Sequence, residues 1–250
     1  MTSHSLERAA YGCLSVAPQI IHDAPLLTIV LSSKPERLRA RVPSPLRPHP
    51  DGRLILNMWA LSDPCQTTGF GAPGPVGVSY LAAEVAGPEG ASNDGTVTFP
   101  GRVWLEHWNS SEAARAYARA ASGLEIDAGE TELRIEDNQL TARLRLGGRI
   151  VIEARARIGM QKLGLRAGHS VYYGERHAGG GRSEVARFDV PWVAEGFPAD
   201  EPEVAFDFEP NTGTADLVEN GSQAVIAASF RRMTLVPYLA SCQNQIEIDV

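Results

Sequence analysis

Apolar and polar residues alternate along most of this chain, in runs of strand length separated by turn residues. The segments 78–86 and 96–108 alternate on either side of a polar turn at 87–95, a pattern typical of two paired strands. The largely apolar run 25–31 predicts a buried strand, and the run 54–61 predicts the next one. These segments already indicate a protein whose core is built from sheet.

The second half of the chain continues this pattern. The segment 132–158 predicts two or three strands, because residue pairs at 137–138 (DN) and 147–148 (GG) interrupt it and such pairs favour tight hairpins. The last apolar segment, 224–243, predicts either a helix or a strand followed by a helix, with a break at Pro237. Further strands are predicted at 170–175, 184–190 and 204–208.

Two short helices are predicted in the first half. One spans residues 34–42 and begins near Pro35, whose fixed φ suits the first helical turn. The other spans 109–121, with a capping Asn or Ser at its start, Glu112 in its first turn and Gly123 as its terminator. Helices are therefore expected to flank the sheet rather than to build the core.

Many strands and few helices predict a β-rich α+β fold, with antiparallel strands arranged as a double sheet or as a barrel-like structure. The length of 250 residues suits one domain spanning 1–250 better than two small ones. The sequence has no internal repeat, no low-complexity tract and no linker. We therefore expect one β-rich domain with a sizeable core.

The charge and hydropathy of the chain argue against several classes of partner. A net charge of -7 disfavours nucleic acid, since phosphate binding requires clustered lysine and arginine. The sequence has no run of about 18 apolar residues and no basic, apolar leader, so neither a membrane span nor a signal peptide is expected. We expect a soluble, cytoplasmic protein whose partner is a small-molecule substrate.

The sequence lacks the residue patterns of common cofactor and metal sites. It contains no Rossmann glycine motif after a strand, no P-loop, no H-E-x-x-H and no G-x-S-x-G. Its three cysteines have no paired spacing, so free thiols are expected rather than disulfides or zinc ligands. No cofactor and no metal are therefore predicted.

The strand predicted to end at residue 108 carries the most suggestive side chains. With strict alternation, Trp104, Glu106 and Trp108 share one face, whereas His107 faces the other way and is interpreted as structural. Two tryptophans and a carboxylate suit a cavity wall, where burial would disfavour the charged form of Glu106 and make it a proton donor. The alternative is a glutamate at the sheet rim beside core aromatics, and the pattern leaves both interpretations open.

Three longer stretches carry a further signal: Arg37–Pro48 (RLRARVPSPLRP), Met58–Gly71 (MWALSDPCQTTGFG) and Asn109–Gly129 (NSSEAARAYARAASGLEIDAG). In this order they resemble the acetoacetate decarboxylase family, and the second stretch is the most specific. The resemblance extends over residues 24–160, and more loosely beyond. It implies an acetoacetate decarboxylase-like, barrel-like double sheet around an enclosed cavity, and a homo-oligomeric assembly.

The same resemblance points to a missing residue. In that family a lysine forms a Schiff base with the ketone of the substrate, and a neighbouring cation activates it. Alignment of Arg119 with the family's G-R-E arginine places Ile126 at the Schiff-base position and Asp127 at the position of the activating lysine. Neither side chain can form an imine. The two lysines of the chain, Lys34 and Lys162, lie far away in sequence, so the chain resembles a divergent member without the Schiff-base lysine.

Other positions of the family align less closely. Its strand glutamate falls on Asn57, and its N-terminal arginine falls near Ala24. Its glutamate after the glycine-rich loop has no firm counterpart, and Tyr80 and Glu84 are the nearest candidates. The resemblance therefore implies a shaped pocket without an imine-forming group, lined by Asn57, Trp59, Trp104, Glu106 and residues near Ile126.

Our leading hypothesis is a lysine-independent enzyme that holds a larger, more apolar substrate in a reactive conformation. This would suit a cyclase, of pericyclic or cycloaddition type, that acts on a polyketide-like intermediate of secondary metabolism. Two alternatives remain: a non-imine decarboxylase or lyase of a small keto acid, and a non-catalytic ligand-binding protein on the same fold.

Each candidate residue has an expected role. Asn57 and Tyr80 would hydrogen-bond a substrate oxygen. Glu106 or Asp127 would act as the acid or base, and Arg119 would orient an anion or serve a structural role. The remaining candidates would form the walls that bind the substrate: Trp59, Trp104, Ile126 and Phe70.

Overall fold

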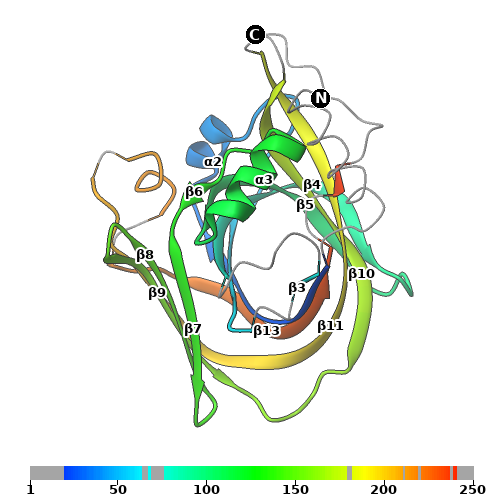
Figure 1. Cartoon of the computed structure of the whole chain (residues 1–250), viewed down its shortest axis with the longest axis vertical. Helices are drawn as coiled ribbons and strands as arrows, with labels where there is room; N and C mark the ends of the chain where they lie inside the picture. The colour runs from blue at the N-terminus through cyan, green and yellow to red at the C-terminus, as the bar shows by residue number, and fades with distance from the viewer. Residues whose placement is uncertain are drawn as a thin grey trace, which may run out of the picture.

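The computed structural model describes residues 20–63, 67–68, 76–178, 182–210, 212–218, 221–236 and 239–240. Within these ranges the strands join into one 14-stranded sheet, and two short helices lie towards one end of the molecule (Figure 1). The predicted β-rich, barrel-like fold is confirmed. The elements are β1 (Ile20–Ser32), α2 (Pro35–Arg41), β2 (Arg53–Leu61), β3 (Thr67–Thr68), β4 (Val76–Ser92), β5 (Thr98–Asn109), α3 (Glu112–Ser122), β6 (Asp127–Ala128), β7 (Glu130–Glu136), β8 (Gln139–Leu146), β9 (Arg149–Ile158), β10 (Leu165–Ala178), β11 (Arg182–Phe206), β12 (Gly221–Ser222), β13 (Val225–Leu235) and β14 (Leu239–Ala240).

Part of the sheet closes into a ring. The ring runs in the order β4, β2, β1, β13, β11 and β10, and it closes because β10 also pairs with β4. β5 fills the seam, since it pairs antiparallel with β4 and parallel with β10. Figure 1 looks into this ring.

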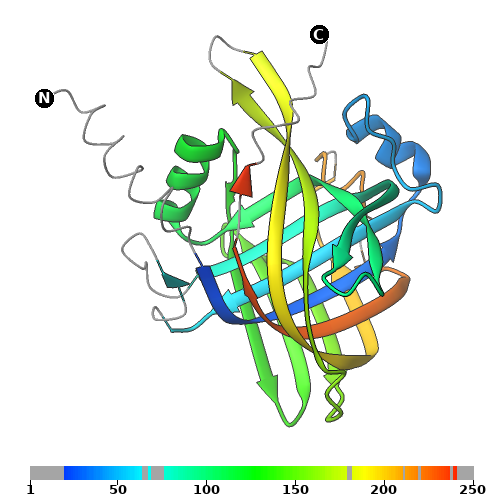
Figure 2. The same cartoon turned by 90° about the vertical axis from the view of Figure 1, so that its right-hand side faces the viewer.

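β11 connects the ring to a second sheet. Its 25 residues pair first with β10, then with β13 over residues 192–198, and finally with β9 from residue 199 onwards. A bulge between Asp200 and Glu203 turns the strand out of the ring. Figure 2 shows β10 and β11 as a long twisted pair that extends past one end of the ring.

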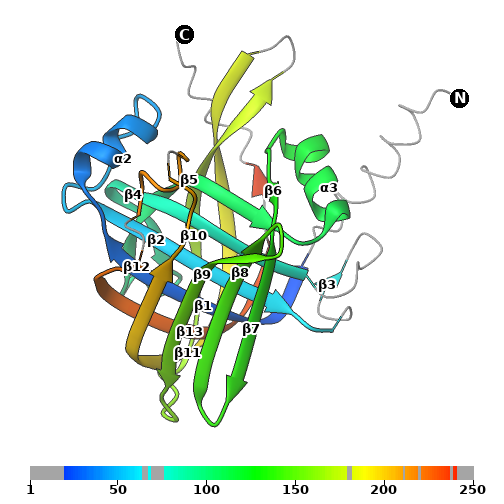
Figure 3. The ribbon, with the colours of Figure 1, turned by 90° about the vertical axis from the view of Figure 1, so that its left-hand side faces the viewer.

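The outer sheet, β9-β8-β7, covers the outside of the ring. Figure 3 shows these strands lying across β2, β4 and β5. Because side chains alternate along a strand, Leu56 and Met58 of β2 join the core beneath the outer sheet, whereas Asn57 and Trp59 line the inside of the ring. β2 is therefore buried on both faces, which explains its nearly continuous apolar sequence.

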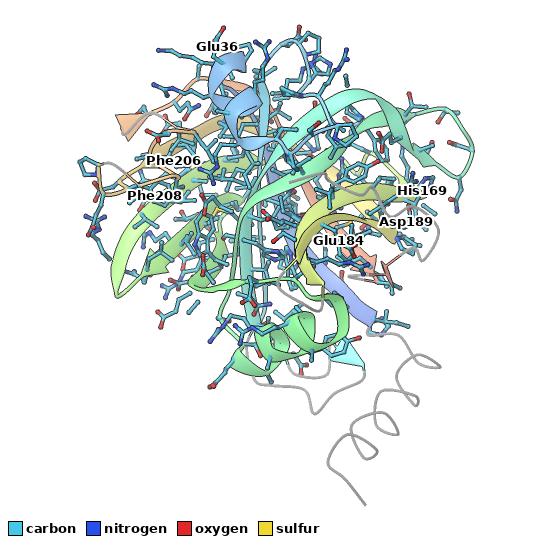
Figure 4. All side chains as sticks on the ribbon, turned by 90° about the horizontal axis from the view of Figure 1, so that it is seen from above. Glu36, His169, Glu184, Asp189, Phe206 and Phe208 are labelled. Atoms are coloured by element: carbon cyan, nitrogen blue, oxygen red, sulfur yellow. The ribbon has the colours of Figure 1, made fainter. Side chains whose placement is uncertain are left out.

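Aromatic residues complete the core between the ring and the outer sheet. Phe206 and Phe208 stack with ring centroids 6.1 Å apart, and Trp108 stacks on Phe208 at 6.0 Å. Figure 4 shows Phe206 and Phe208 on this side of the molecule, opposite His169 and Asp189 of β10 and β11. The main apolar core thus lies outside the ring, and the inside of the ring is left for a separate group of side chains.

Both predicted short helices are confirmed. α2 begins with Pro35. At the start of α3 the Ser111 side chain accepts a hydrogen bond from the Ala114 backbone N–H, and Gly123 ends the helix with a left-handed φ of 68°. No helix of the described segments is long and apolar enough to cross a membrane.

The predicted hairpins of the outer sheet are also confirmed. Asp137 and Asn138 have φ values of 49° and 64°, and Gly147 and Gly148 have values of 56° and 83°. Two consecutive residues with positive φ match the twist of the flanking strands. These local turns fix the register of β7, β8 and β9.

Three expectations about strand boundaries are wrong. Of the two alternatives for 224–243, the single helix is wrong: the segment begins with the strand β13, because the cross-strand neighbours β1 and β11 cover its apolar positions. The short strand β14 follows at Leu239–Ala240, and residues 237–238 and 241–243 lie outside the described residues. The turn predicted at 87–95 is shorter, since bulges beside Pro88 and Gly90 keep β4 paired with β5 as far as the pair Ala91 and Thr98. The strands predicted at 184–190 and from residue 204 are parts of the single strand β11.

Candidate functional site

A cavity lies inside the ring. Alternate side chains from β1, β2, β4, β5, β10, β11 and β13 line this inner cavity, which has a volume of about 50 Å³. That space suits a few water molecules or one small, flat group. Half of its lining residues carry a polar group: Thr28, Asn57, Tyr80, Arg102, His107, Ser170, Tyr172 and Arg231; the other half are aliphatic residues, methionine or tryptophan.

A bulge in β5 decides which of its side chains enter the inner cavity. Leu81 pairs with Glu106, whereas the next residue of β4, Ala82, pairs with Trp104. One residue of β5 is therefore extra, and it reverses the alternation beyond that point. Trp104 and His107 both line the cavity. The prediction that Trp104, Glu106 and Trp108 share one face is wrong for this reason.

Neither carboxylate predicted as the acid or base lines the inner cavity. Glu106 lies in a neighbouring pocket that shares Trp104 and His107 with the inner cavity, and its Oε1 is 3.0 Å from Nη2 of Arg41. Asp127 is exposed on β6, which pairs with the end of β5. The structure therefore does not bring these two residues together with Asn57 and Tyr80.

The other predicted site residues lie in three different places. Trp59 and Trp104 line the inner cavity with Asn57 and Tyr80, as expected of wall residues. Ile126 is buried in the apolar cluster that also contains Leu124. Arg119 is exposed on α3, where its Nη2 lies 2.9 Å from Oε2 of Glu125. Phe70 lies outside the described residues.

Hydrogen bonds link three side chains of the cavity lining into a chain. Arg102 Nη1 donates to the hydroxyl oxygen of Tyr172 at 3.2 Å, and this oxygen lies 3.0 Å from the hydroxyl oxygen of Tyr80. Trp104 stacks on Tyr172 with a centroid distance of 4.9 Å and an interplanar angle of 10°. Either hydroxyl can be the donor in this pair, and in the arrangement in which Tyr172 donates, the Tyr80 hydroxyl can donate in turn.

Arg102 is held in place by a buried carboxylate. Glu84, 5% exposed, has one oxygen 3.8 Å from Nη2 of Arg102 and the other 3.8 Å from Nη1 of Arg53. Burial lowers the pKa of Arg102, but Tyr172, Tyr80 and Glu84 outweigh this effect and raise the pKa above its usual value. Arg102 therefore remains a cation beside the tyrosines.

Arg231 brings a second cation to the cavity. Its guanidinium lies over Trp192, 5.8 Å from the ring centroid. Burial and then the positive charge of Arg102 lower the pKa of Arg231, although an arginine stays charged at neutral pH. Among the described residues, no carboxylate lies within ion-pair distance of Arg231. The inner cavity therefore has an excess of positive charge that suits an anion.

Two further groups define the polarity of the cavity. Burial lowers the pKa of His107 to about 3, so that His107 is neutral at physiological pH. Thr28 Oγ1 donates to Asn57 Oδ1 at 2.6 Å, while Asn57 Nδ2 is buried and has no hydrogen-bond partner within the described structure. A ligand oxygen would satisfy this amide. The described residues contain no cluster of three or more side chains that could bind a metal ion.

Sequence reasoning missed several residues of this site. Arg102, Tyr172, Trp192 and Arg231 were not candidates, and His107 was interpreted as structural. Alternation with Trp104 is the one signal that could have identified Arg102. Arg231 lies in the segment for which a helix was an alternative, so its face could not be assigned.

The fold is that of acetoacetate decarboxylase. No protein-family model and no curated protein matches the sequence. A solved acetoacetate decarboxylase superimposes with a TM-score of 0.70 at 17% identity, covering 93% of this chain and 91% of that one. The enzyme of that name from Legionella pneumophila gives 0.70 at 13%, covering 92% and 88%. The enduracididine biosynthesis enzyme MppR, complexed with pyruvate, gives 0.59 at 13%, covering 89% and 90%. The fold implied by the sequence resemblance is thereby confirmed.

Proposed function

We propose that this chain is a lysine-independent enzyme that activates a conjugated carbonyl group by hydrogen bonding, and that it cyclises a polyketide-like oxo acid. The observation that carries this proposal is the chain of donors from Arg102 through Tyr172 to Tyr80. Hydrogen bonds in a chain polarise one another, so the guanidinium makes the last hydroxyl a stronger donor. A carbonyl oxygen that accepts from Tyr80 would become more electrophilic along its conjugated system.

The positions of the lysines support a mechanism without an imine. Lys162 is exposed and lies 2.9 Å from Glu195, and Lys34 precedes the first turn of α2. Neither lysine lines the inner cavity, and no carboxylate of the described residues does so. His107 is a weak base because of its low pKa of about 3. Cyclisation of a conjugated chain fits such a site, because it requires neither an amine nor a strong base.

The aromatic walls support a flat, conjugated substrate. Trp59, Trp104 and Trp192 line the same cavity as the tyrosine pair. Trp104 is already stacked on Tyr172, and stacking on such faces would hold the flat conjugated carbonyl group of the substrate in one conformation. Restricting a flexible chain to its reactive conformation can supply several kcal/mol towards the barrier, roughly 7–11 in the best cases.

The second candidate function is decarboxylation of a small 3-oxo acid without an imine. Arg231 favours it, because an uncompensated cation in the cavity suits a carboxylate. The structural neighbours named as acetoacetate decarboxylases, and the pyruvate complex of MppR, agree with an oxo acid as ligand. Both candidates share the same prerequisite, which is an oxo acid bound with its carbonyl oxygen at Tyr80.

A push-pull chromophore tests this prerequisite. 4-Dimethylaminobenzylidenepyruvate carries a conjugated ketone and a carboxylate, and its absorption band moves to longer wavelength when the ketone oxygen accepts strong hydrogen bonds. We expect such a shift on binding, a smaller one in Tyr172→Phe, and an unchanged one in the double variant Lys34→Arg, Lys162→Arg. Borohydride should trap no adduct. A trapped adduct on either lysine would overturn the proposal.

Turnover separates the remaining functions. Conjugated 3-oxo acids would be incubated with the protein and followed by NMR and mass spectrometry. A cyclised product formed without loss of carbon supports the cyclase, whereas release of carbon dioxide supports the decarboxylase. Binding with no conversion of any acid in the series would indicate a ligand-binding protein and exclude the leading proposal.

A further inference from the structure

A second pocket adjoins the inner cavity. Trp192 and Arg231 line both spaces, so that one indole and one guanidinium form a shared wall. This outer pocket has a volume of about 300 Å³, compared with about 50 Å³ for the inner cavity. The outer pocket, which is the larger of the two, therefore adjoins the cavity that contains the hydrogen-bonded chain from Arg102 to Tyr80. The guanidinium of Arg231 lies in the wall between them.

The side chains of β11 explain why the wall opens at this point. Trp192, Ala194 and Gly196 follow one another on the same face of the strand, and all three line the outer pocket. Their size decreases along the strand, and Gly196 is the direct cross-strand partner of Arg231. The small residues leave room beside the guanidinium that a regular apolar strand would fill.

The chemistry of the outer pocket is apolar with cations at its edge. Phe99 and Phe230 line it, and Phe99 lies 6.1 Å from Trp192 between ring centroids. The charged residues of its described lining are Arg166 and Arg231. A ligand that combines an apolar chain or ring with one negative group would match this lining.

We infer that the outer pocket is a second subsite, which binds the apolar chain or ring of a carboxylate whose charged group lies at Arg231. The inference rests on the proposed function, because the reacting carbonyl is placed in the inner cavity. The inner cavity has room for only a small, flat group. The substrate is therefore an oxo acid with two arms on the carbon that bears the carboxylate: the conjugated carbonyl reaches Tyr80, and the apolar remainder lies in the outer pocket.

A series of ω-phenylalkanoates from phenylacetate to 6-phenylhexanoate tests the subsite. Quenching of tryptophan fluorescence would give the dissociation constant of each acid. We expect affinity to rise by roughly fourfold for each methylene that enters the outer pocket, and the matching phenylalkanols to bind far more weakly than the acids.

The variant Gly196→Phe fills the outer pocket. A Cβ at this position would lie 3.5 Å from Leu163, an ordinary contact, so a side chain fits and points into the pocket. This variant should lose the gain in affinity with chain length, because the added ring occupies the space that the longer acids would enter. Ile226→Phe, which places the same ring at an exposed position of β13, should keep the gain.

The outcomes separate the two proposals. Binding of phenylacetate without any gain for longer acids would overturn the second subsite and leave the carbonyl site in place. Equal weakening of every acid by Gly196→Phe, or equal loss of the gain in Ile226→Phe, would also overturn it. If no acid binds to the wild type, the anion site itself is wrong, and both proposals fail.

Discussion

The hydroxyl oxygens of Tyr80 and Tyr172 lie 3.0 Å apart, although 92 residues separate them in sequence. Tyr80 belongs to β4 and Tyr172 to β10, and these strands pair directly only near Ser92 and Gly168. The closure of the ring brings the two hydroxyls together. The donor chain from Arg102 therefore depends on the fold as a whole, and each link can be tested by changing one side chain.

Removal of the middle hydroxyl should break the chain. In Tyr172→Phe, Arg102 loses its acceptor and Tyr80 loses its neighbour, while the ring that stacks on Trp104 is kept. We expect turnover to fall by about 10²-fold, the usual effect of losing one preorganised donor. Steady-state kinetics on an accepted oxo acid would measure the change.

The adjacent tyrosine provides a matched control. Tyr173 points away from the inner cavity, and its hydroxyl donates to Glu89. Tyr173→Phe should leave turnover within about threefold of the wild type. If the two variants lose activity equally, the hydroxyl of Tyr172 has no special role and the donor chain does not operate.

The protein should become less stable as the pH is lowered, because His107 is buried in its neutral form. The unfolded chain takes up a proton at the ordinary imidazole pKa of 6.5, whereas burial lowers the folded value to about 3. Between these values the unfolded state binds more protons, so stability is lost as the pH falls below 6.5. From pH 6.5 to 4.5 the free energy of unfolding should decrease by about 2–3 kcal/mol from this residue alone.

Urea denaturation at several pH values would measure this slope. In His107→Gln the position no longer titrates, so the decrease over the same range should be much smaller. Parallel pH profiles for the variant and the wild type would contradict the buried, neutral state of His107. The window ends at pH 4.5 because carboxylates with lowered pKa values, such as Asp23 and Glu153, contribute at lower pH.

The buried carboxylate of Glu84 should be required for stability. Glu84→Gln leaves Arg53 and Arg102 without the charge that lies 3.8 Å from each, and we expect a loss of roughly 3 kcal/mol in the free energy of unfolding. The double variant with Arg102→Met should lose less, since one uncompensated cation is removed. Glu153→Gln, which breaks a more exposed pair with Arg143, should cost at most about 1 kcal/mol. Similar losses in both single variants would contradict this role.

Much of the fold could be predicted because its signals are local. The cap at Ser111, the left-handed Gly123 and the hairpin pairs at 137–138 and 147–148 depend on a few neighbouring residues. Hydrophobic patterning also identified most of the longer strands, and the resemblance in sequence indicated the fold. These features do not require knowledge of which strands are neighbours.

The site was harder to predict because it depends on long-range pairing. The bulge between Trp104 and Glu106 reverses the faces of β5, and it is defined only by the partner strand β4. Arg102 of β5 and Arg231 of β13 lie on strands that are not neighbours in the sheet, and both side chains line the same cavity because the ring is closed. The resemblance could therefore suggest Asn57, Trp59 and Tyr80 as pocket residues, but periodicity could not show that Glu106 lies outside the inner cavity.

Arg231 should illustrate a conflict between stability and binding. Its guanidinium is largely buried beside Trp192, and it has no carboxylate partner among the described residues. Removal of this charge from water on folding therefore lowers the stability of the folded state. Arg231→Met keeps an unbranched stem that reaches the position of Nε, and it removes that charge. We expect the variant to be more stable by about 1 kcal/mol and to bind phenylacetate at least tenfold more weakly.

Arg232 is the matched control for this prediction. It is the next residue of β13, it is exposed, and its guanidinium pairs with Asp23. Arg232→Met should change stability by less than about 1 kcal/mol and leave the affinity for phenylacetate unchanged. Denaturant titrations and fluorescence binding measurements on both variants would decide the matter. If Arg231→Met is less stable than the wild type and binds the acid equally well, Arg231 is a structural cation, and the anion site must lie elsewhere.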